Sequence, residues 1–318
     1  MSVLNNRHEF VAFFEVINGN PNGDPDAGNL PRMDIDTNLG LITDVCLKRK
    51  VRNYVEMKHD GEAGFNIFVK ESSILNEQQR LAYKAVRPND PSVEKAPKLN
   101  PKDDNEAKSL LAFMCQNFFD VRTFGAVMGT GVNVGAIRGP VQFGFANSVE
   151  PILPVEITIT RMAATSAKEL KDVKNSSEGE NERTDNRTMG RKHIVPYGLY
   201  RVHGFISAKN AQKSGFSEAD LDVFFDALEN MFEHDHAAAR GEMSMRKLFV
   251  FKHQSEYGNA PAHALFDLIK VFRNVDGERR ELGDARLNDI TPARRFSDYV
   301  IEVDRGKVPN GVTLIERL

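Results

Sequence analysis

The sequence predicts an α+β fold, a ferredoxin-like sheet interrupted by large insertions. Runs typical of strands and helical periodicities follow one another in the order strand, helix, strands, helix, strand, which is the βαββαβ order of such a sheet. Two long stretches between these elements fit neither pattern. The chain has 318 residues, which is long for one compact domain and short for three.

The first predicted elements are a strand, a loop and a helix. Residues 8–17 are rich in Phe and Val and predict a largely buried strand. Residues 18–26 are nearly all turn formers, so a loop follows. Thr43 or Asp44 can cap the helix that comes next. Its apolar face carries Leu47, Val51, Tyr54 and Val55 at helical spacing.

The middle of the chain contains both insertions. Residues 60–103 combine a short apolar run, a predicted helix at 76–86 and a loop with several prolines, and a second helix is expected at 107–119. After a glycine-rich stretch and a short strand, residues 155–162 alternate as a strand does. Residues 165–190 contain almost no large apolar side chain, so we expect a protruding hairpin or a loop that orders on a partner.

The last third returns to regular elements. A strand is predicted at 199–208 and a helix capped by Ser217, followed by a strand at 246–251. The helix turns Leu221, Phe224, Phe225 and Leu228 inward. Residues 299–303 and the turn at 309–311 predict a closing hairpin.

Composition excludes several classes of protein. The longest apolar runs fall short of about eighteen residues, so we expect no membrane span and no membrane partner. Cys46 and Cys115 lie in apolar helical patterns, which favours buried thiols and a cytoplasmic protein over a disulfide. A net charge of −3 argues against indiscriminate nucleic-acid binding, so any RNA site must concentrate positive charge on one track.

No catalytic or cofactor motif is complete. Gly129, Gly131 and Gly135 miss the dinucleotide spacing by one residue, and no Walker lysine follows, so the glycines mark either a structural turn or a close approach to a sugar-phosphate chain. The loop at 18–26 resembles a calcium loop, but Asn29 stands where a bidentate Glu is needed. We therefore expect no metal, no cofactor and no enzymatic activity.

Basic side chains gather at three places in this slightly acidic chain. They are Lys48, Arg49 and Arg52 on the first helix, Arg138 among the glycines, and Arg187, Arg191 and Lys192 at the end of the polar segment, where His193 follows. Such clusters indicate a defined phosphate path. An ordinary solvated face is the alternative for the helix cluster.

Several separate motifs resemble CRISPR-associated backbone subunits. They are the first strand with its loop at 18–26, residues 32–45, the Asp-Val-Arg-Thr-Phe-Gly motif at 120–125, and residues 137–142 and 189–198. Together they cover most of the chain. They are similar to the Cas seven backbone subunits of type I-C Cascade, within the RAMP superfamily.

The resemblance implies a single modified RRM-like palm domain over residues 1–318. A finger-like helical region is expected at 60–118 and a thumb-like projection at 163–193. Several copies would polymerise along one CRISPR RNA, with each thumb folding over the guide at the neighbouring copy. Sequence is then read by base pairing with target DNA, while the protein contacts the RNA backbone.

The resemblance also implies partners and site residues. The partners are CRISPR RNA, target DNA through the guide, further copies of the chain and other Cascade subunits. The expected RNA-binding residues are Asn20, Asn22, Lys48, Arg49, Arg52, Arg138, Met189, Arg191, Lys192 and His193. They would serve a non-catalytic subunit in antiviral defence.

Two alternatives stay open at this point. Backbone subunits of type III complexes cut target RNA with a loop Asp, and Asp24, Asp26 or Asp36 would be the corresponding metal-dependent residues here. A plain scaffold protein without RNA is the other alternative. It requires the basic helix cluster to be merely solvated.

Overall fold

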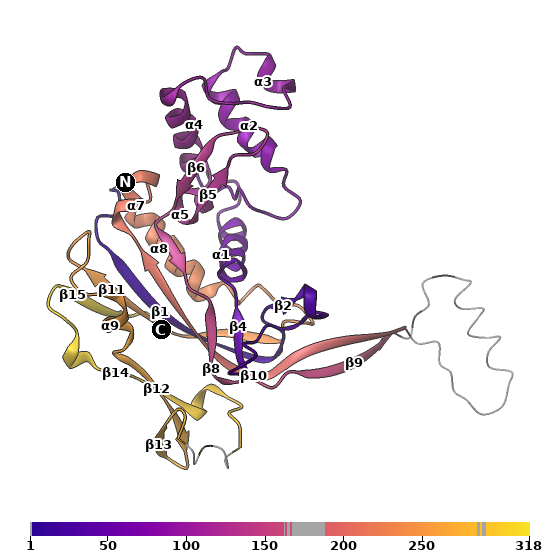
Figure 1. Cartoon of the computed structure of the whole chain (residues 1–318), viewed down its shortest axis with the longest axis vertical. Helices are drawn as coiled ribbons and strands as arrows, with labels where there is room; N and C mark the ends of the chain where they lie inside the picture. Colours follow the sequence, from indigo (N-terminus) through magenta and orange to yellow (C-terminus); the bar gives the residue numbers. More distant parts are fainter. Residues whose placement is uncertain (1, 162, 164–165, 167–187, 285–286, 288–290) are drawn as a thin grey trace.

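The computed structural model describes the whole chain except residues 1, 162, 164–165, 167–187, 285–286 and 288–290. A body built on one large sheet carries a helical region above it and a long hairpin that projects to one side (Figure 1). Most of the predicted polar segment at 165–190, including Arg187, lies outside the described residues.

The central sheet has eight strands. In sheet order they are β15 (Val312–Glu316), β11 (Glu242–His253), β1 (His8–Gly19), β10 (Thr188–Ile206), β8 (Ala146–Pro151) and β4 (Leu39–Ile42), with β7 (Val141–Phe143) and β9 (Val155–Arg161) paired to β10. Strand β1 lies between β10 and β11 and is antiparallel to both. A large antiparallel sheet is therefore present, as an α+β fold predicts, and the predicted first strand at 8–17 is confirmed within β1.

Two helices cover one face of the sheet. In α1 (Asp44–Lys58) the Thr43 side chain accepts a hydrogen bond from the Cys46 amide, as its cap position predicts. In α8 (Glu218–Asn230), Ser217 and Asp220 form a capping box. The helices pack on each other, and their apolar faces share one core with the inward side chains of β1 and β10.

The opposite face of the sheet is covered by the C-terminal part of the chain. A second core lies there between the sheet, α9 (Ala262–Phe266) and a small three-stranded sheet. The small sheet consists of β13 (Glu278–Glu281), β12 (Ile269–Val275) and β14 (Tyr299–Val303). Because β1 has a core on each side, His8 to Val16 are buried without interruption.

The predicted closing hairpin at 299–311 is wrong. Strand β14 pairs with β12 in the small sheet, whereas β15 pairs with β11 in the central sheet. The turn is present, since the Val312 amide donates to the Pro309 carbonyl at 3.1 Å. This turn carries the chain from the small sheet to the central sheet. The predicted turn is therefore confirmed, but the strands on either side of it do not pair with each other.

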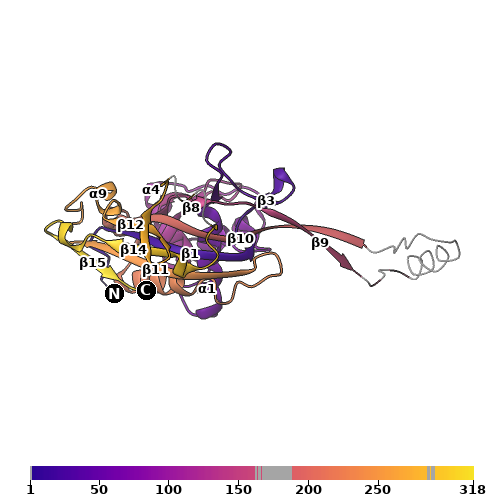
Figure 2. The same ribbon diagram turned by 90° about the horizontal axis from the view of Figure 1, so that it is seen from below.

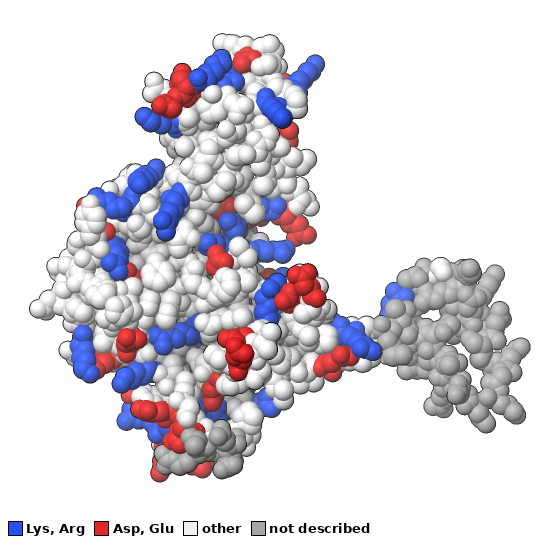
Figure 3. Space-filling view, viewed as in Figure 1, with Lys and Arg blue, Asp and Glu red and all other residues white. Residues whose placement is uncertain are grey.

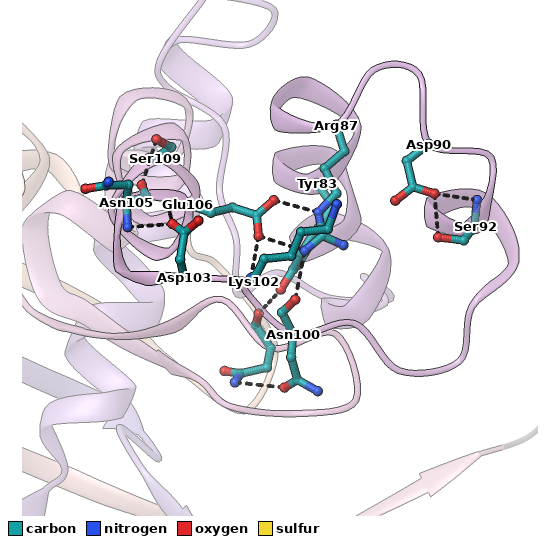
Figure 4. Close-up of polar contacts among 11 residues, drawn as sticks. Tyr83, Arg87, Asp90, Ser92, Asn100, Lys102, Asp103, Asn105, Glu106 and Ser109 are labelled. Atoms are coloured by element: carbon teal, nitrogen blue, oxygen red, sulfur yellow. Dashed lines mark hydrogen bonds and ion pairs between the residues drawn. The ribbon is translucent and has the colours of Figure 1, made fainter.

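The helical region forms a third core of its own. Its elements are α2 (Leu75–Val86), α3 (Ser92–Lys95), α4 (Asp104–Asn117) and the hairpin of β5 (Gly125–Met128) and β6 (Gly135–Arg138). Arg87 after α2 donates twice to Glu106 on α4, at 2.6 and 2.8 Å (Figure 4). This paired contact lowers the pKa of Glu106 to about 2 and joins the two helices. We call this region the finger.

Strands β9 and β10 continue past the edge of the body as a two-stranded hairpin (Figure 2). Their register pairs Val155 with Ile194 at the root and Arg161 with Thr188 at the described end. The hairpin thus begins at Val155, before the predicted start of the thumb-like projection at 163, and its pairing ends at Ile194, one residue after the predicted end at 193. Strand β10 alone has 19 residues and reaches from the hairpin to the middle of the sheet.

Short elements connect these layers. They are β2 (Gly23–Asp24), η1 (Pro25–Ala27), β3 (Leu30–Pro31), α5 (Phe119–Phe124), α7 (Ala208–Ser214), η4 (Phe296–Asp298) and η5 (Arg305–Lys307). The predicted strand at 199–208 ends two residues early, because Ser207 accepts a hydrogen bond from the Asn210 amide and caps α7.

Acid is expected to destabilise the protein through His8 in β1. Burial lowers the pKa of its imidazole from 6.5 to about 4, with smaller lowering effects from Lys252 and His253. The unfolded chain therefore takes up this proton first, so the stabilisation is complete above pH 6.5 and is lost as the pH falls from 6.5 towards 4. Melting temperatures measured by circular dichroism between about pH 7.5 and about pH 4.5 test this. A His8→Gln variant should lose less stability over that range, and an unchanged acid sensitivity of the variant would contradict the assignment.

Candidate nucleic-acid interface

Helix α1 carries three of the predicted RNA-binding residues, but they differ in exposure. The Lys48 ammonium lies 3.0 Å from Asp44 and donates to the Gln142 side chain at 3.1 Å, with its side chain 11% exposed. Arg49 is 62% exposed and lies 3.4 Å from Glu71, which is 85% exposed. Neighbouring Lys50 is buried against Asp235. The helix cluster is thus not a solvated face, and Arg49 is its accessible cation.

Arg52 belongs to a buried network. Its Nε donates to Asp120 Oδ2 at 2.8 Å, and its guanidinium lies over the Phe124 ring. Asp120 also accepts hydrogen bonds from the amides of Phe68 and Val69, and its side chain is 1% exposed. This carboxylate of α5 therefore connects α5 to α1 and to the segment at Phe68 and Val69, which precedes α2. The proposed contact of Arg52 with RNA remains a prediction.

The rest of the motif at 120–125 is also structural. Arg122 donates to Asp220 Oδ1 at 2.7 and 3.0 Å, and both side chains are buried. The same Asp220 closes the capping box of α8. The motif thus connects α5 to the start of α8, which sequence reasoning from spacing alone did not show.

The asparagines of the first loop hold local structure. Asn22 accepts hydrogen bonds through Oδ1 from the amide and the hydroxyl of Thr43, at the cap of α1. Asn20 Nδ2 donates to the Asn29 carbonyl at 2.7 Å, while its buried Oδ1 has no partner among the described residues. Both residues position the loop beside α1, and their RNA contacts stay predictions.

Arg138 lies at the end of β6 and is exposed. It takes part in none of the ion pairs found among the described residues. The glycines around it divide into two kinds. Gly139 and Gly125 press backbone against backbone, as a Cβ at Gly139 would lie 2.3 Å from the Gly125 nitrogen, whereas a Cβ at Gly129 would meet nothing within 4 Å. Of the glycines singled out in the sequence, Gly135 has a φ of +100°, which fits the structural-turn interpretation, whereas Gly129 faces open space.

The predicted residues on the hairpin lie on β10. Arg191, 74% exposed, pairs with Glu156 of β9 at 3.2 Å, and Met189 is opposite Thr160. Lys192 and His193 are half-buried. Because side chains alternate along a strand, Lys192 points to the other face from Arg191 and His193.

These residues come from elements that surround one recess. Figure 1 shows α1 between the finger and the β9–β10 hairpin, with the β5–β6 hairpin at the base of the finger. Along this concave edge, Figure 3 shows Lys and Arg atoms interleaved with Asp and Glu atoms. We call this concavity the recess. Its charge is mixed, which fits the weakly acidic composition.

Sequence reasoning missed the lysines of the finger. Lys95, Lys98, Lys102 and Lys108 are exposed, and none is in an ion pair with a described residue. The signal was the spacing of the first three, which follow one another every three or four residues from the end of α3 to the start of α4. The prolines between these lysines favour turns, and the stretch was therefore interpreted as a loop.

The described residues contain no group of three or more His, Cys, Asp or Glu side chains arranged to hold a metal ion. Asp24 accepts from the Asp26 amide and lies 3.4 Å from Arg32, while Asp36 is exposed on a separate turn. Within the same part of the chain, no helix is long and apolar enough to cross a membrane.

The profile of a family described as CRISPR-associated protein Cas7 matches residues 6–304. The chain belongs to the Cas7 family. A relative named CRISPR-associated protein Cas7, from Haloferax volcanii, is 24% identical over 312 residues, which cover 94% of this chain and 81% of the relative. The predicted family is thereby confirmed for this Cas7-family chain, whereas the subtype is not decided.

Two solved structures are less similar to this chain in sequence than that relative is. A chain of a "CRISPR RNA-guided surveillance complex, pre-nicking" is 14% identical with a TM-score of 0.48, covering 77% of this chain and 78% of that one. A chain of a type III-B Cmr-beta complex bound to cognate target RNA is 11% identical with a TM-score of 0.38, covering 77% and 61%. At these values the Cas7-family assignment rests on the sequence matches.

Proposed function

We propose that this chain is a non-catalytic CRISPR RNA-binding backbone subunit of a type I-C Cascade complex in the cytoplasm. Copies polymerise along the guide and present it for pairing with target DNA in antiviral defence. The observation that carries the proposal is the recess, where α1, the finger and the projecting hairpin meet in a chain whose family match spans nearly its whole length. In this proposal the central sheet is a modified RRM-like palm and the β9–β10 hairpin is the thumb.

The accessible cations suit a phosphate path. Arg49 and Arg138 are exposed on two elements of the recess, and the finger lysines extend positive charge beyond them. Contacts of this kind fix an RNA backbone without reading its bases, as a subunit that must accept any guide requires. Lys48 and Arg52 would support the RNA site indirectly, because Lys48 donates to Gln142 of β7 and Arg52 pairs with Asp120 of α5, and both contacts hold α1 in place.

The hairpin carries a surface suited to another copy of the chain. Val155, Ile157 and Ile159 alternate along β9 and are 41%, 42% and 44% exposed. Because alternate residues share one face of a strand, they form a continuous apolar stripe. Such a stripe is usually covered by a protein partner. We assign it to the neighbouring subunit, over which the thumb would fold.

Charge reversal at the two exposed arginines is the test. The protein is purified natively with the products of its operon neighbours, and the RNA that accompanies it is sequenced and quantified. Uniform small RNAs with repeat-derived ends are expected, and the double variant Arg49→Glu and Arg138→Glu should retain less than about a tenth of them, since the phosphate contacts become repulsive. Lys213→Glu on α7, also exposed, is the matched control and should retain them. An assembled complex free of RNA at low salt would refute the proposal.

The same preparation tests the non-catalytic assignment. A complementary RNA is incubated with the loaded complex and Mg²⁺, and no cleavage is expected. Asp24 and Asp26 share one turn, where Asp24 pairs with Arg32, and Asp36 lies on a separate turn, which supports this expectation. Cleavage that disappears in Asp24→Asn, Asp26→Asn or Asp36→Asn variants, with guide binding intact, would replace it with the type III mechanism.

A further inference from the structure

A cavity of about 480 Å³ opens on the face of the central sheet that is covered by the C-terminal part of the chain. Its walls come from β8 and β10 on one side and from β12 and β13 on the other. Phe145, Arg201, His203, Lys270, Phe272 and Glu281 are among the lining residues. The volume is in the range of small-ligand sites. We call it the sheet cavity.

The register of the sheet shows which way its polar residues face. Arg201 and His203 on β10 are opposite Phe13 and Val11 of β1, which belong to the core shared with α9 and the small sheet. Tyr200 and the other alternate residues of β10 pack with α1 and α8 instead. The sheet cavity therefore lies on the opposite side of the sheet from α1.

Arg201 is a half-buried cation that forms no ion pair with a described residue. Its two Nη atoms donate to the carbonyls of Phe266 and Ile269 at 2.7 and 3.3 Å, and its buried Nε has no partner among the described residues. No described carboxylate lies within ion-pair distance of it, and Asp267 acts only from further away. A half-buried guanidinium without a counter-charge can take an anionic group as its partner.

His203 supplies a neutral hydrogen-bonding group beside it. Burial lowers the pKa of its imidazole to about 4, and Arg201 adds to the lowering. The ring is therefore uncharged near neutral pH, with one donor and one acceptor nitrogen. It stacks on Phe266 at 4.1 Å between centroids, which fixes the ring plane, and its buried Nε2 has no partner among the described residues.

Aromatic and basic side chains complete the cavity. Phe145 is 55% exposed, an unusual exposure for a phenylalanine beside a cavity, and Phe272 lies on the opposing strand. Lys270 is exposed at the rim, and Glu281 is the single carboxylate among the described lining residues. A nucleobase stacks on such a ring, while its phosphate is attracted by the guanidinium and the ammonium group.

We propose that the sheet cavity is a second nucleotide-binding site, which takes one nucleotide of a single-stranded nucleic acid. The base lies against Phe145 and hydrogen-bonds to His203, and the phosphate faces Arg201 and Lys270. This site is separate from the recess and does not depend on the recess holding the guide. A free nucleotide offers the same chemistry, so the experiment must separate it from a strand.

Photocrosslinking of the full complex tests the proposal. The probe is a short single-stranded oligonucleotide containing 5-iodouridine, and mass spectrometry locates the attachment. We expect crosslinks in the segments 142–149 and 270–282, which unlabelled oligonucleotide suppresses and inorganic phosphate does not. Phe145→Ala and Lys270→Glu should each reduce the yield about tenfold, because a stack or a phosphate contact is lost. Lys213→Glu on α7, an equal charge change outside the cavity, should leave it unchanged.

The outcomes separate this site from the proposed function. Guide RNA is extracted and quantified from the same preparations, and the Phe145 and Lys270 variants should keep it even when crosslinking is lost. Crosslinks confined to the finger and α1 would overturn the proposal, as would a neighbouring polypeptide attached at the cavity in place of the oligonucleotide. If uridine monophosphate suppressed the crosslinks as effectively as the unlabelled oligonucleotide does, the assignment to a strand would be overturned. A free nucleotide would then be the ligand.

Discussion

The substitution Gly139→Ala is expected to cost more than about 4 kcal/mol of folding free energy, enough to unfold many domains of this size. A Cβ at this position would lie 2.3 Å from the Gly125 nitrogen and the Phe124 carbonyl carbon, and 2.4 Å from the Thr123 oxygen. All three are backbone atoms, which cannot rotate aside as a side chain can. The β5–β6 hairpin is paired at this point, so relief requires the base of the finger to separate.

A second glycine from the same stretch is the control. Gly129→Ala places its methyl group where nothing lies within 4 Å, so the change should stay within about 0.5 kcal/mol. The chain has no Trp, so urea unfolding of both variants is followed by circular dichroism. Equal unfolding midpoints for the two variants would contradict the close packing of Gly139 against Gly125.

Replacing Asp120 with alanine is expected to destabilise the protein by about 3–5 kcal/mol. The carboxylate is 1% exposed and accepts from Arg52 Nε at 2.8 Å and from the amides of Phe68 and Val69 at 2.8 and 3.1 Å. Its removal leaves a nearly buried guanidinium without a counter-charge and two amides without an acceptor. Urea unfolding measures the loss.

A double variant separates the orphaned charge from the lost hydrogen bonds. Arg52→Met combined with Asp120→Ala should be more stable than Asp120→Ala alone, because no unpaired charge remains. Glu71→Ala is the surface control. Its side chain is 85% exposed and its ion pair with Arg49 spans 3.4 Å, so its loss should cost less than about 0.5 kcal/mol. If the double variant were no more stable than the single one, the buried ion pair would not be the cause.

Elements with strong local signals were predictable from the sequence. Thr43 and Ser217 cap their helices as their residue types indicate, and the uninterrupted apolar run of β1 reflects a core on each of its sides. The last strand shows the limit of local signals. Its turn at 309–311 is real, but pairing with β11 depends on residues about 60 positions earlier in the chain, which turn chemistry does not encode.

The site was less predictable, because charge at a surface depends on distant partners. Arg49 and Arg52 have the same side chain on the same helix, three residues apart. One meets the exposed Glu71, and the other meets Asp120, 68 residues away in sequence and buried. Helical periodicity places both near the recess but does not show which of them is already neutralised. The cavity beside Arg201 could not be predicted either, because its walls come from segments far apart in sequence.

Strand β10 runs without interruption from Thr188 on the hairpin to Ile206 at the end of the sheet. At about 3.3 Å per residue, its 19 residues give a strand about 60 Å long. The inner part lies between β1 and the strands β7 and β8, and the outer part pairs with β9 among the described residues. Strand β10 is continuous where it leaves the body, at Val195 and Pro196. In the proposed array of copies, a force on the hairpin would therefore act on the centre of the sheet, and the hairpin should keep its angle to the body.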